Sequence, residues 1–209
     1  YSNIGPWNTY GVVYTPNGNR WIPNYQNGYG AIGCSGTRGL FFNWIADIDM
    51  FNKYGDGSFI GILIHNRGFT SNGSVATTHI MSINDQHPTN PDFDLMNYGA
   101  QSGVKVRLDG NEYFGVMPTG WYFMACSYDH RVGRANFWLN GERIVESSIS
   151  RGHLPTATGS YIFTSVSASP ASVAIQEYVH VKGPVTPMEM SGVMSAWQRK
   201  YNIVYADIQ

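Results

Sequence analysis

The sequence predicts an all-β fold, an antiparallel two-sheet β-sandwich with one C-terminal α-helix. Three observations support it: side chains alternate between apolar and polar in many short segments, turn signals separate these segments, and charged residues make up only 13% of the chain. Period-two alternation is typical of half-buried strands, and regularly spaced turn signals are typical of hairpins. No Pro- or Ser-rich linker divides the 209 residues. We therefore expect residues 1–209 to form a single domain of a longer or processed protein.

Two segments around Asn140-Gly141 give the clearest strand pattern. Side chains alternate between apolar and polar in residues 120–129 and 137–142, and each segment ends at a turn. An Asn-Gly pair between hydrophobic strands favours a hairpin, because a type I′ turn needs positive φ at both central residues. The residues before 40 are rich in turn signals, among them Asn27-Gly-Tyr-Gly30, so we expect a loop-rich first stretch. Further strands are predicted at 40–50, 58–65, 77–83, 104–108, 111–116, 160–166 and 173–181.

One segment near the C-terminus has the pattern of a helix. Thr186-Pro-Met-Glu189 combines an N-cap residue, Pro at the first helical position and Glu three residues after the cap. Apolar residues then recur at helical spacing and form one stripe. We expect this stripe to pack against a sheet, and a membrane or partner helix is the alternative. The stripe consists of Met190, Val193, Met194, Trp197 and Tyr201.

Composition and charge exclude several classes of function. The formal net charge is −1 and no basic stripe is present, which argues against nucleic-acid binding. No apolar run approaches the roughly 20 residues of a membrane-spanning helix, so we expect no membrane insertion. The two cysteines, Cys34 and Cys126, leave two alternatives open, which are free thiols and one disulfide.

The stretch from Gly120 to Tyr201 carries several structural motifs in a fixed order. They are Trp121, Ala125 and Tyr128-Asp129, then Phe137-Trp138-Leu139 with Asn140-Gly141, then Ile175–Val179, and finally Val185–Met190. In these motifs the stretch resembles the laminin-G-like, concanavalin A-like superfamily of lectin and glucanase jelly rolls. The resemblance implies a jelly-roll sandwich that binds glycans, cleaves glycans or serves in adhesion. Two departures from the superfamily pattern are Gln176 in place of an acidic residue and Pro170–Ser172 in place of a glycine.

Candidate catalytic residues are few. Glycan hydrolysis on such a fold needs two carboxylates set across a groove. Asp47 and Asp49 share one face of a predicted strand but have no partnering Glu, so we interpret them as a solvated strand face. Elimination chemistry would need a His or Tyr base near an Arg or Gln, and His65 and the other histidines are spread over predicted strands and turns. We expect no enzyme, with a glycan-cleaving enzyme built on the two aspartates as an alternative.

The segment 84–97 is dense in oxygen-bearing side chains, and we interpret it as one loop. Calcium binds six to eight oxygen atoms from carboxylates, amides and carbonyls, so such a loop could fold around it. The alternative is a polar loop whose Asn, Asp and Pro residues set turns. Calcium is the one cofactor that the sequence suggests. The candidate ligands are Asp85, Asn90, Asp92 and Asp94.

Aromatic residues alternate with Asn, Gln and Gly in the first stretch, which is unlike a core strand. Exposed Trp and Tyr rings can stack on the C–H faces of sugars, while amides and carboxylates take the hydroxyls. Packing over a sheet face and contact with a partner subunit explain these residues equally well. The candidate ligand-binding residues are Trp7, Tyr10, Trp21, Tyr25 and Tyr29.

The function that we expect is non-catalytic recognition of a glycan or cell-surface polysaccharide, in an extracellular location or at a virion or cell surface. The alternative class is a structural or adhesion module of a larger assembly, such as a phage or viral fibre or a capsid decoration. Low charge, an aromatic surplus and the missing catalytic pair fit that class. Such a module would be a homo-oligomer or part of its parent virion.

Overall fold

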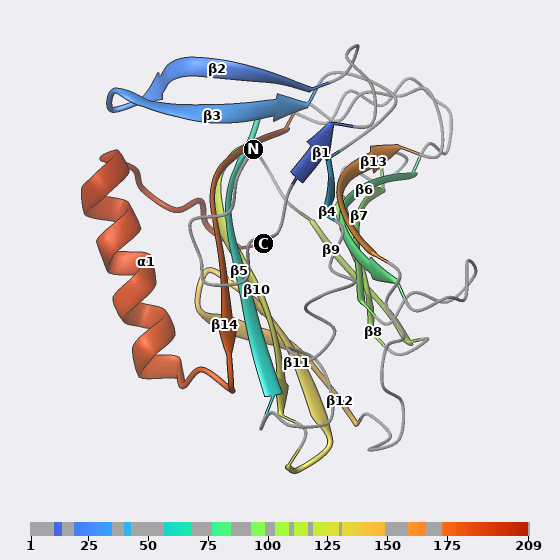
Figure 1. Cartoon of the computed structure of the whole chain (residues 1–209). Coiled ribbons are helices and arrows are strands. Elements are labelled where there is room, and N and C mark those ends of the chain that lie inside the picture. Colours follow the sequence, from blue (N-terminus) through green and yellow to red (C-terminus); the bar gives the residue numbers. More distant parts are fainter. Residues whose placement is uncertain are drawn as a thin grey trace.

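A computed structural model gives the arrangement of most strands and of the C-terminal helix. It consists of two antiparallel sheets that face each other, with one helix on the outer face of the second sheet (Figure 1). The expected all-β sandwich with a single C-terminal helix is therefore confirmed. The structure describes residues 11–13, 19–34, 40–42, 57–67, 77–84, 93–98, 103–108, 111–116, 119–129, 131–148, 159–165 and 173–208.

Each sheet has seven described strands. The first sheet has the order β1-β4-β13-β6-β7-β8-β9, and the second has the order β12-β11-β10-β5-β14-β3-β2. The strands of the first sheet are β1 Gly11–Val13, β4 Leu40–Phe42, β6 Thr77–Asn84, β7 Phe93–Tyr98, β8 Gly103–Leu108, β9 Asn111–Val116 and β13 Gly159–Ser165. Those of the second are β2 Asn19–Gln26, β3 Tyr29–Cys34, β5 Gly57–Asn66, β10 Gly120–Asp129, β11 Arg134–Leu139, β12 Glu142–Ser148 and β14 Val173–Lys182.

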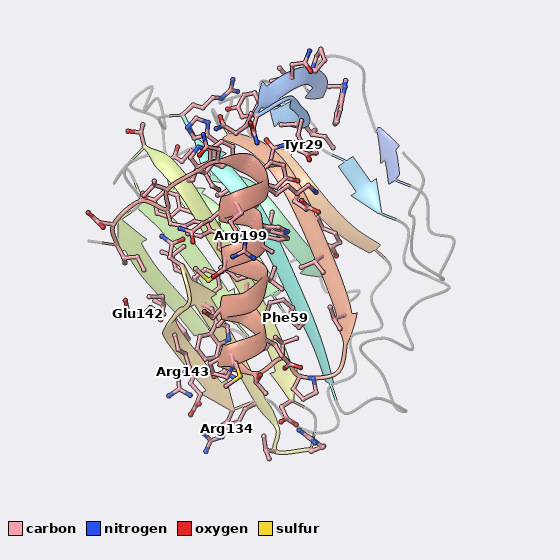
Figure 2. The ribbon with its side chains drawn as sticks, turned by 90° about the vertical axis from the view of Figure 1, so that its left-hand side faces the viewer. Tyr29, Phe59, Arg134, Glu142, Arg143 and Arg199 are labelled. Carbon is pink, nitrogen blue, oxygen red and sulfur yellow. The ribbon has the colours of Figure 1, made fainter. Side chains whose placement is uncertain are left out.

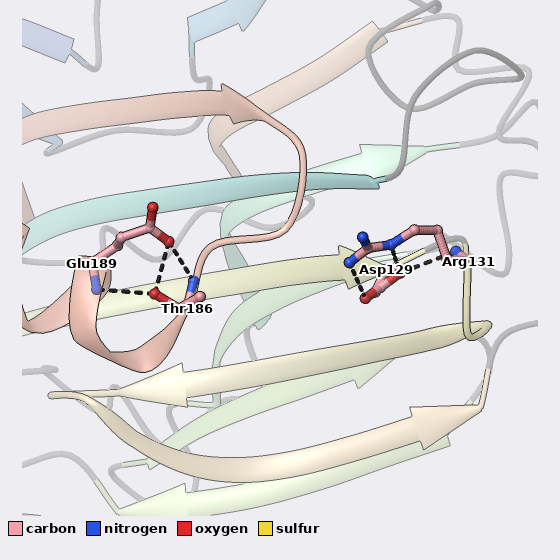
Figure 3. A network of polar contacts seen from close by, with 4 residues as sticks. All are labelled: Asp129, Arg131, Thr186 and Glu189. Carbon is pink, nitrogen blue, oxygen red and sulfur yellow. Dashed lines mark hydrogen bonds and ion pairs between the residues drawn. The ribbon is translucent and has the colours of Figure 1, made fainter.

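The helix α1, Pro187–Tyr201, begins with the predicted capping box. The Glu189 carboxylate accepts hydrogen bonds from the backbone N–H and the hydroxyl of Thr186, and the Glu189 backbone N–H donates to that hydroxyl (Figure 3). The same view shows Asp129 paired with Arg131 just beyond the end of β10. At its other end α1 stops at Asn202, which adopts a left-handed conformation. Both helix ends therefore follow from local capping residues.

The apolar stripe of α1 packs against the second sheet, as the sequence predicts. Phe123 of β10 lies at the centre of this contact, with its ring 5.3 Å from that of Trp197 and 6.4 Å from that of Phe59. Gly61 of β5 makes room for it, because a Cβ there would lie 3.1 Å from the Phe123 ring. The buried cluster consists of Phe59, Leu63, Trp121, Phe123, Ala125, Met190, Trp197, Tyr201 and Ile203.

Two expectations about local structure are wrong. The residues expected to be loops before residue 40 contain the hairpin β2–β3, whose strands pair from Asn19 with Cys34 to Gln26 with Tyr29. The segment 84–97, expected to be one loop, contains β7, in which Asp94 pairs with Ser82 of β6. Of the strand predicted at 40–50, the structure describes Leu40–Phe42, and Asp47 and Asp49 lie outside the described residues.

The strand order excludes a disulfide between Cys34 and Cys126. Cys34 ends β3 and Cys126 lies in β10, and the strands β14 and β5 run between them. Three strand spacings separate the two cysteines by about 14 Å across the sheet. A disulfide needs Cα atoms within about 7 Å.

The hairpin turn at Asn140-Gly141 is present, and Asn140 does more than turn the chain. Its φ of 48° and the φ of 83° at Gly141 are the positive values that the pattern predicts. The Asn140 side chain accepts a hydrogen bond from the Phe123 backbone N–H at 2.8 Å and donates one to the Ala206 carbonyl at 2.7 Å. One side chain thus ties the β11–β12 turn to β10 and to the segment after α1.

We expect Asn140→Ala to lower the free energy of unfolding by roughly 3 kcal/mol, since it removes two hydrogen bonds and places Ala at positive φ. Asn140→Gly keeps the positive φ at no cost and should lose about 2 kcal/mol. Urea unfolding of both variants measures the difference. Equal stability of Asn140→Ala and the wild type would contradict this role for the side chain.

Candidate ligand-binding hairpin

The hairpin β2–β3 lies at one end of α1 and is attached to it by side-chain hydrogen bonds. Its turn is Asn27-Gly28, with φ values of 48° and 79°. The Gln26 amide donates to the Tyr201 carbonyl at 3.0 Å, and the Asn27 amide donates to the Lys200 carbonyl at 2.8 Å. These carbonyls belong to the last turn of α1, where the helix leaves backbone acceptors without partners. The turn of the hairpin therefore caps the helix and is fixed by it.

Several large apolar side chains of the described chain are exposed, and the two aromatic ones among them belong to this hairpin. Trp21 is 52% exposed and Tyr29 is 45% exposed. The two rings project from opposite faces of the hairpin. Trp21 is paired with Ile32, and Ile32 is paired through Ile175 of β14 with Ile64 of β5. The side chains of this row, Trp21 included, lie on the face of the sheet away from α1. Tyr29 is on the face of α1, with its ring 5.2 Å from that of Tyr201.

The indole of Trp21 lies across Gly30 of the neighbouring strand. A Cβ built on Gly30 would come within 1.9 Å of the indole, so only glycine leaves space for the ring here. Gln176 contacts the same glycine, since its amide nitrogen donates to the Gly30 carbonyl at 2.8 Å. Trp21 therefore presents an exposed flat ring that rests on backbone and is supported by a buried amide.

Gln176 is itself unusual because its amide is only half satisfied. The side chain is 8% exposed, and its Oε1 has no hydrogen-bond partner among the described residues. Gln176 is the extra residue of an irregularity in β14, where the pairing with β5 shifts between Ile175 and Glu177. A buried amide oxygen without a partner is costly unless water or a ligand supplies a donor. Gly30, on which the Trp21 ring rests, is therefore bonded to a side chain whose Oε1 atom can still accept a hydrogen bond.

On the α1 side, Tyr29 belongs to a closed network of protein contacts. The Lys200 ammonium lies 5.2 Å from the centre of the Tyr29 ring and 2.9 Å from the Glu177 carboxylate. Glu177 also accepts a hydrogen bond from the Tyr201 hydroxyl. Burial, followed by this hydrogen bond, raises the pKa of Tyr201 to about 12. The ring of Tyr29 is thus engaged by the helix, whereas that of Trp21 remains open.

A second polar group lies beyond the end of α1, and we call it the Arg67 cluster; it comprises Tyr25, His65, Arg67 and Trp121. His65 stacks on Trp121 with ring centres 4.4 Å apart and an interplanar angle of 9°. The Tyr25 hydroxyl lies 2.6 Å from His65 Nδ1, and the Arg67 guanidinium lies 6.0 Å from the centre of the Tyr25 ring. Tyr25 and His65 are half-buried, and Arg67 is exposed.

Two effects favour the neutral imidazole of His65. Burial lowers the pKa of His65 below its ordinary value, and the positive charge of Arg67 lowers it further. Burial raises the pKa of Tyr25, so its hydroxyl keeps its proton at neutral pH. A protonated hydroxyl can donate to Nδ1 of a neutral imidazole, and in that tautomer the imidazole proton is on Nε2.

The structure brings together part of the predicted ligand-binding set. Trp21, Tyr25 and Tyr29 share the hairpin, Tyr25 being mostly engaged in packing, while Trp7 and Tyr10 lie outside the described residues. Of the predicted calcium ligands, Asp85, Asn90 and Asp92 also lie outside them, and Asp94 is in β7. Within the described chain, no three His, Cys, Asp or Glu side chains gather as a metal site. Calcium binding stays a prediction.

Sequence reasoning missed Gln176, His65 and Arg67 as members of these sites. Only the pairing of β3, β14, β5 and β10 places them beside the hairpin residues. One local signal was available for the hairpin itself. Asn27-Gly28 is the same dipeptide as Asn140-Gly141, and it is flanked by residues with strand propensity such as Trp21, Ile22 and Ile32.

Comparison with known proteins shows the fold. No family model matches the chain, and no curated protein matches it at a significant level. Botulinum neurotoxin type C, whose cell entry depends upon interaction with two ganglioside molecules, matches with a TM-score of 0.70 and 10% identity over 94% of this chain and 48% of that chain. The serotype D ligand-binding domain in complex with N-acetylneuraminic acid matches with a TM-score of 0.68 and 12% identity, over 93% and 48%. The serotype DC binding domain in complex with rat synaptotagmin II matches with a TM-score of 0.63 and 9% identity, over 94% and 49%.

The chain spans about half the length of these structures. At 9–12% identity the likeness shows the fold, and the non-catalytic role expected from the sequence stays a prediction. Among the described residues, no helix is long and apolar enough to span a membrane.

We expect Asn27→Gly to lower the free energy of unfolding by about 1 kcal/mol, because it removes the hydrogen bond to the last turn of α1 and keeps a residue suited to positive φ. Asn24→Gly is the matched control, since Asn24 also has positive φ, at 52°, and its side chain forms no hydrogen bond with a described residue. Urea unfolding should show a smaller loss for Asn24→Gly. Equal losses would mean that the Asn27 amide does not hold the hairpin to the helix.

We expect Arg67→Gln to raise the pKa of His65, since it removes a positive charge that disfavours the imidazolium, and to leave it below its ordinary value, since burial remains. The folded-state pKa of His65 lies below the unfolded value, so lowering the pH through the interval between the two values destabilises the wild-type protein. The interval is narrower in the variant, so the same change of pH should destabilise the variant less. Titration of His65 by NMR measures the shift. Arg134→Gln, at the opposite end of the sheet, should leave the pKa of His65 unchanged.

Proposed function

We propose that this chain is a non-catalytic glycan-binding module and that Trp21 is its sugar-stacking platform. The observation that carries the proposal is the exposed Trp21 ring, held flat over Gly30, whose carbonyl is bonded to Gln176, a side chain with an amide oxygen that has no partner among the described residues. A flat aromatic face with a polar acceptor nearby suits a sugar, which has an apolar C–H face and peripheral hydroxyls. The Gln176 oxygen is buried, so a bridging water would link it to a sugar hydroxyl.

The surroundings of Trp21 support a preformed site. The hairpin is fixed to α1 through Gln26 and Asn27 and to β14 through Gln176. A platform that is already ordered loses little conformational entropy when a ligand binds. The structural neighbours include glycan-binding toxin domains, and the match covers about half of each. The proposal for this chain therefore rests on Trp21 and not on the ligands of those toxins.

Two finer assignments belong to the same proposal. We assign the fold to the laminin-G-like, concanavalin A-like jelly rolls, on the order of the motifs between Gly120 and Tyr201 and on the two facing sheets. We place the module outside the cell or at a virion or cell surface, where its glycan ligands are. An adhesion module of a fibre or capsid would have the same fold, and the following experiment separates the two.

We expect the protein to bind at least one glycan on an array of neutral and sialylated oligosaccharides. For that glycan, Trp21→Ala should weaken binding about tenfold in a calorimetric titration, which corresponds to about 1.4 kcal/mol. Trp21 is half exposed, so the melting temperature should change little. A parallel array with a calcium chelator tests the calcium prediction, because loss of glycan binding there would show that binding needs calcium.

Two control variants make the Trp21 result specific. Met188→Ala removes an 84% exposed side chain at the start of α1, the end of the helix distant from the hairpin, and should leave the affinity unchanged. Tyr29→Ala removes the ring on the opposite face of the hairpin and should leave the affinity within about twofold. If no glycan on the array binds, the glycan proposal is wrong and the adhesion module is favoured. Light scattering would then measure the oligomeric state of that module.

A further inference from the structure

Arg67 differs from three other described arginines, which form ion pairs. Arg131 pairs with Asp129, and both Arg134 and Arg143 pair with Glu146. Arg67 forms no ion pair with any described residue, and its guanidinium lies over the ring of Tyr25 instead. Within the described part of the chain, this exposed guanidinium is positioned by an aromatic ring and has no carboxylate partner, an arrangement suited to an external anion.

The neighbours of Arg67 add a second hydrogen-bond donor. We assign the Tyr25 hydroxyl, 2.6 Å from His65 Nδ1, as the donor of that hydrogen bond, which places the imidazole proton on Nε2, where no described residue accepts it. Stacking on Trp121 fixes the plane of the imidazole. Arg67 and His65 both contact Tyr25 from one face of the sheet. The cluster therefore offers two kinds of N–H donor around one aromatic ring, without a carboxylate of the described chain to satisfy them.

These donors match the chemistry of a carboxylate. The guanidinium fork can donate two parallel hydrogen bonds to one carboxylate, and a neutral imidazole N–H can donate a third. The ring of Tyr25 gives an apolar surface beside them. The last carbonyls of α1, which would repel an anion, already accept hydrogen bonds from Gln26 and Asn27.

We propose that the Arg67 cluster binds the carboxylate of an acidic sugar, with Arg67 as the ionic anchor and His65 Nε2 as a second donor. The inference rests on the proposed glycan-binding function and names acidic glycans as its ligand class. Trp21 and Arg67 are on opposite faces of the hairpin, and β2 is the outermost described strand of its sheet. A glycan chain that contacts both residues would therefore pass over the β2 edge.

The test uses matched pairs of glycans on an array, each sialylated or uronic-acid oligosaccharide beside its neutral counterpart. We expect the wild type to bind the acidic member of at least one pair about tenfold more tightly. Arg67→Gln should abolish this preference, and Arg134→Gln, which removes the same charge at the other end of the sheet, should retain it. Higher ionic strength should weaken the preference, since Arg67 is exposed.

NMR then separates a sugar carboxylate from any small anion. The preferred acidic glycan should shift the imidazole resonances of His65 in the wild type but not in Arg67→Gln. Sodium acetate and inorganic phosphate at the same concentration should leave them unchanged. Equal shifts with acetate or phosphate would show a general anion site and would overturn the assignment to sugars.

Failure of this inference is distinguishable from failure of the proposed function. Equal binding of acidic and neutral members in every pair, with Trp21→Ala still weakening both, would overturn the acidic-sugar inference alone. A preference that survives in Arg67→Gln would overturn it as well, because the carboxylate would then be bound elsewhere. A blank array would overturn both.

Discussion

The packing of α1 on the outer face of the second sheet is the contact on which the rest of the described structure depends. Phe123 enters the space that Gly61 leaves open and meets Trp197 of the helix. Truncating a buried aromatic ring of this kind typically costs about 3–5 kcal/mol. Figure 2 shows the helix lying along the sheet, with Tyr29 near its C-terminal end and Arg134 and Arg143 near its beginning. The helix therefore connects the two ends of the sheet.

The position of α1 determines where the candidate ligand-binding residues lie. The end of the helix accepts hydrogen bonds from Gln26 and Asn27, so the hairpin β2–β3 takes its place from the helix as well as from β14. The segment after the helix returns along β10, where Ala206 donates to the Trp121 carbonyl and accepts from Asn140. Trp121 in turn orients His65. The turn of the hairpin and the His65 ring are thus held by contacts that begin at α1.

Local signals in the sequence predict the class of fold and the helix correctly. The capping box at Thr186 and the turn at Asn140-Gly141 depend on neighbouring residues, and such signals can be found without knowing the tertiary structure. The same reasoning applied to Asn27-Gly28 would have found the hairpin β2–β3, but the aromatic residues around it were interpreted as loop residues. Trp21 interrupts a core pattern because its ring lies over Gly30, outside the core.

The membership of the sites could not be predicted in the same way. His65 and Tyr25 are 40 residues apart, and they meet because β14 lies between β3 and β5. Gln176 stands beside Gly30 because an irregularity in β14 turns it there, a feature without a sequence signature. Pairing order and bulges arise from the packing of the whole sheet. The sequence could therefore propose aromatic ligands, but not the polar residues that accompany them.

The most direct test of this account is to map, by NMR, the chemical-shift changes caused by the glycan that binds most tightly. The account predicts the largest changes at the indole N–H of Trp21, the amide of Gly30 and the side-chain amide of Gln176, with the helix-facing ring of Tyr29 little affected. Changes confined to the opposite end of the sheet, around the turn between β10 and β11, would contradict it.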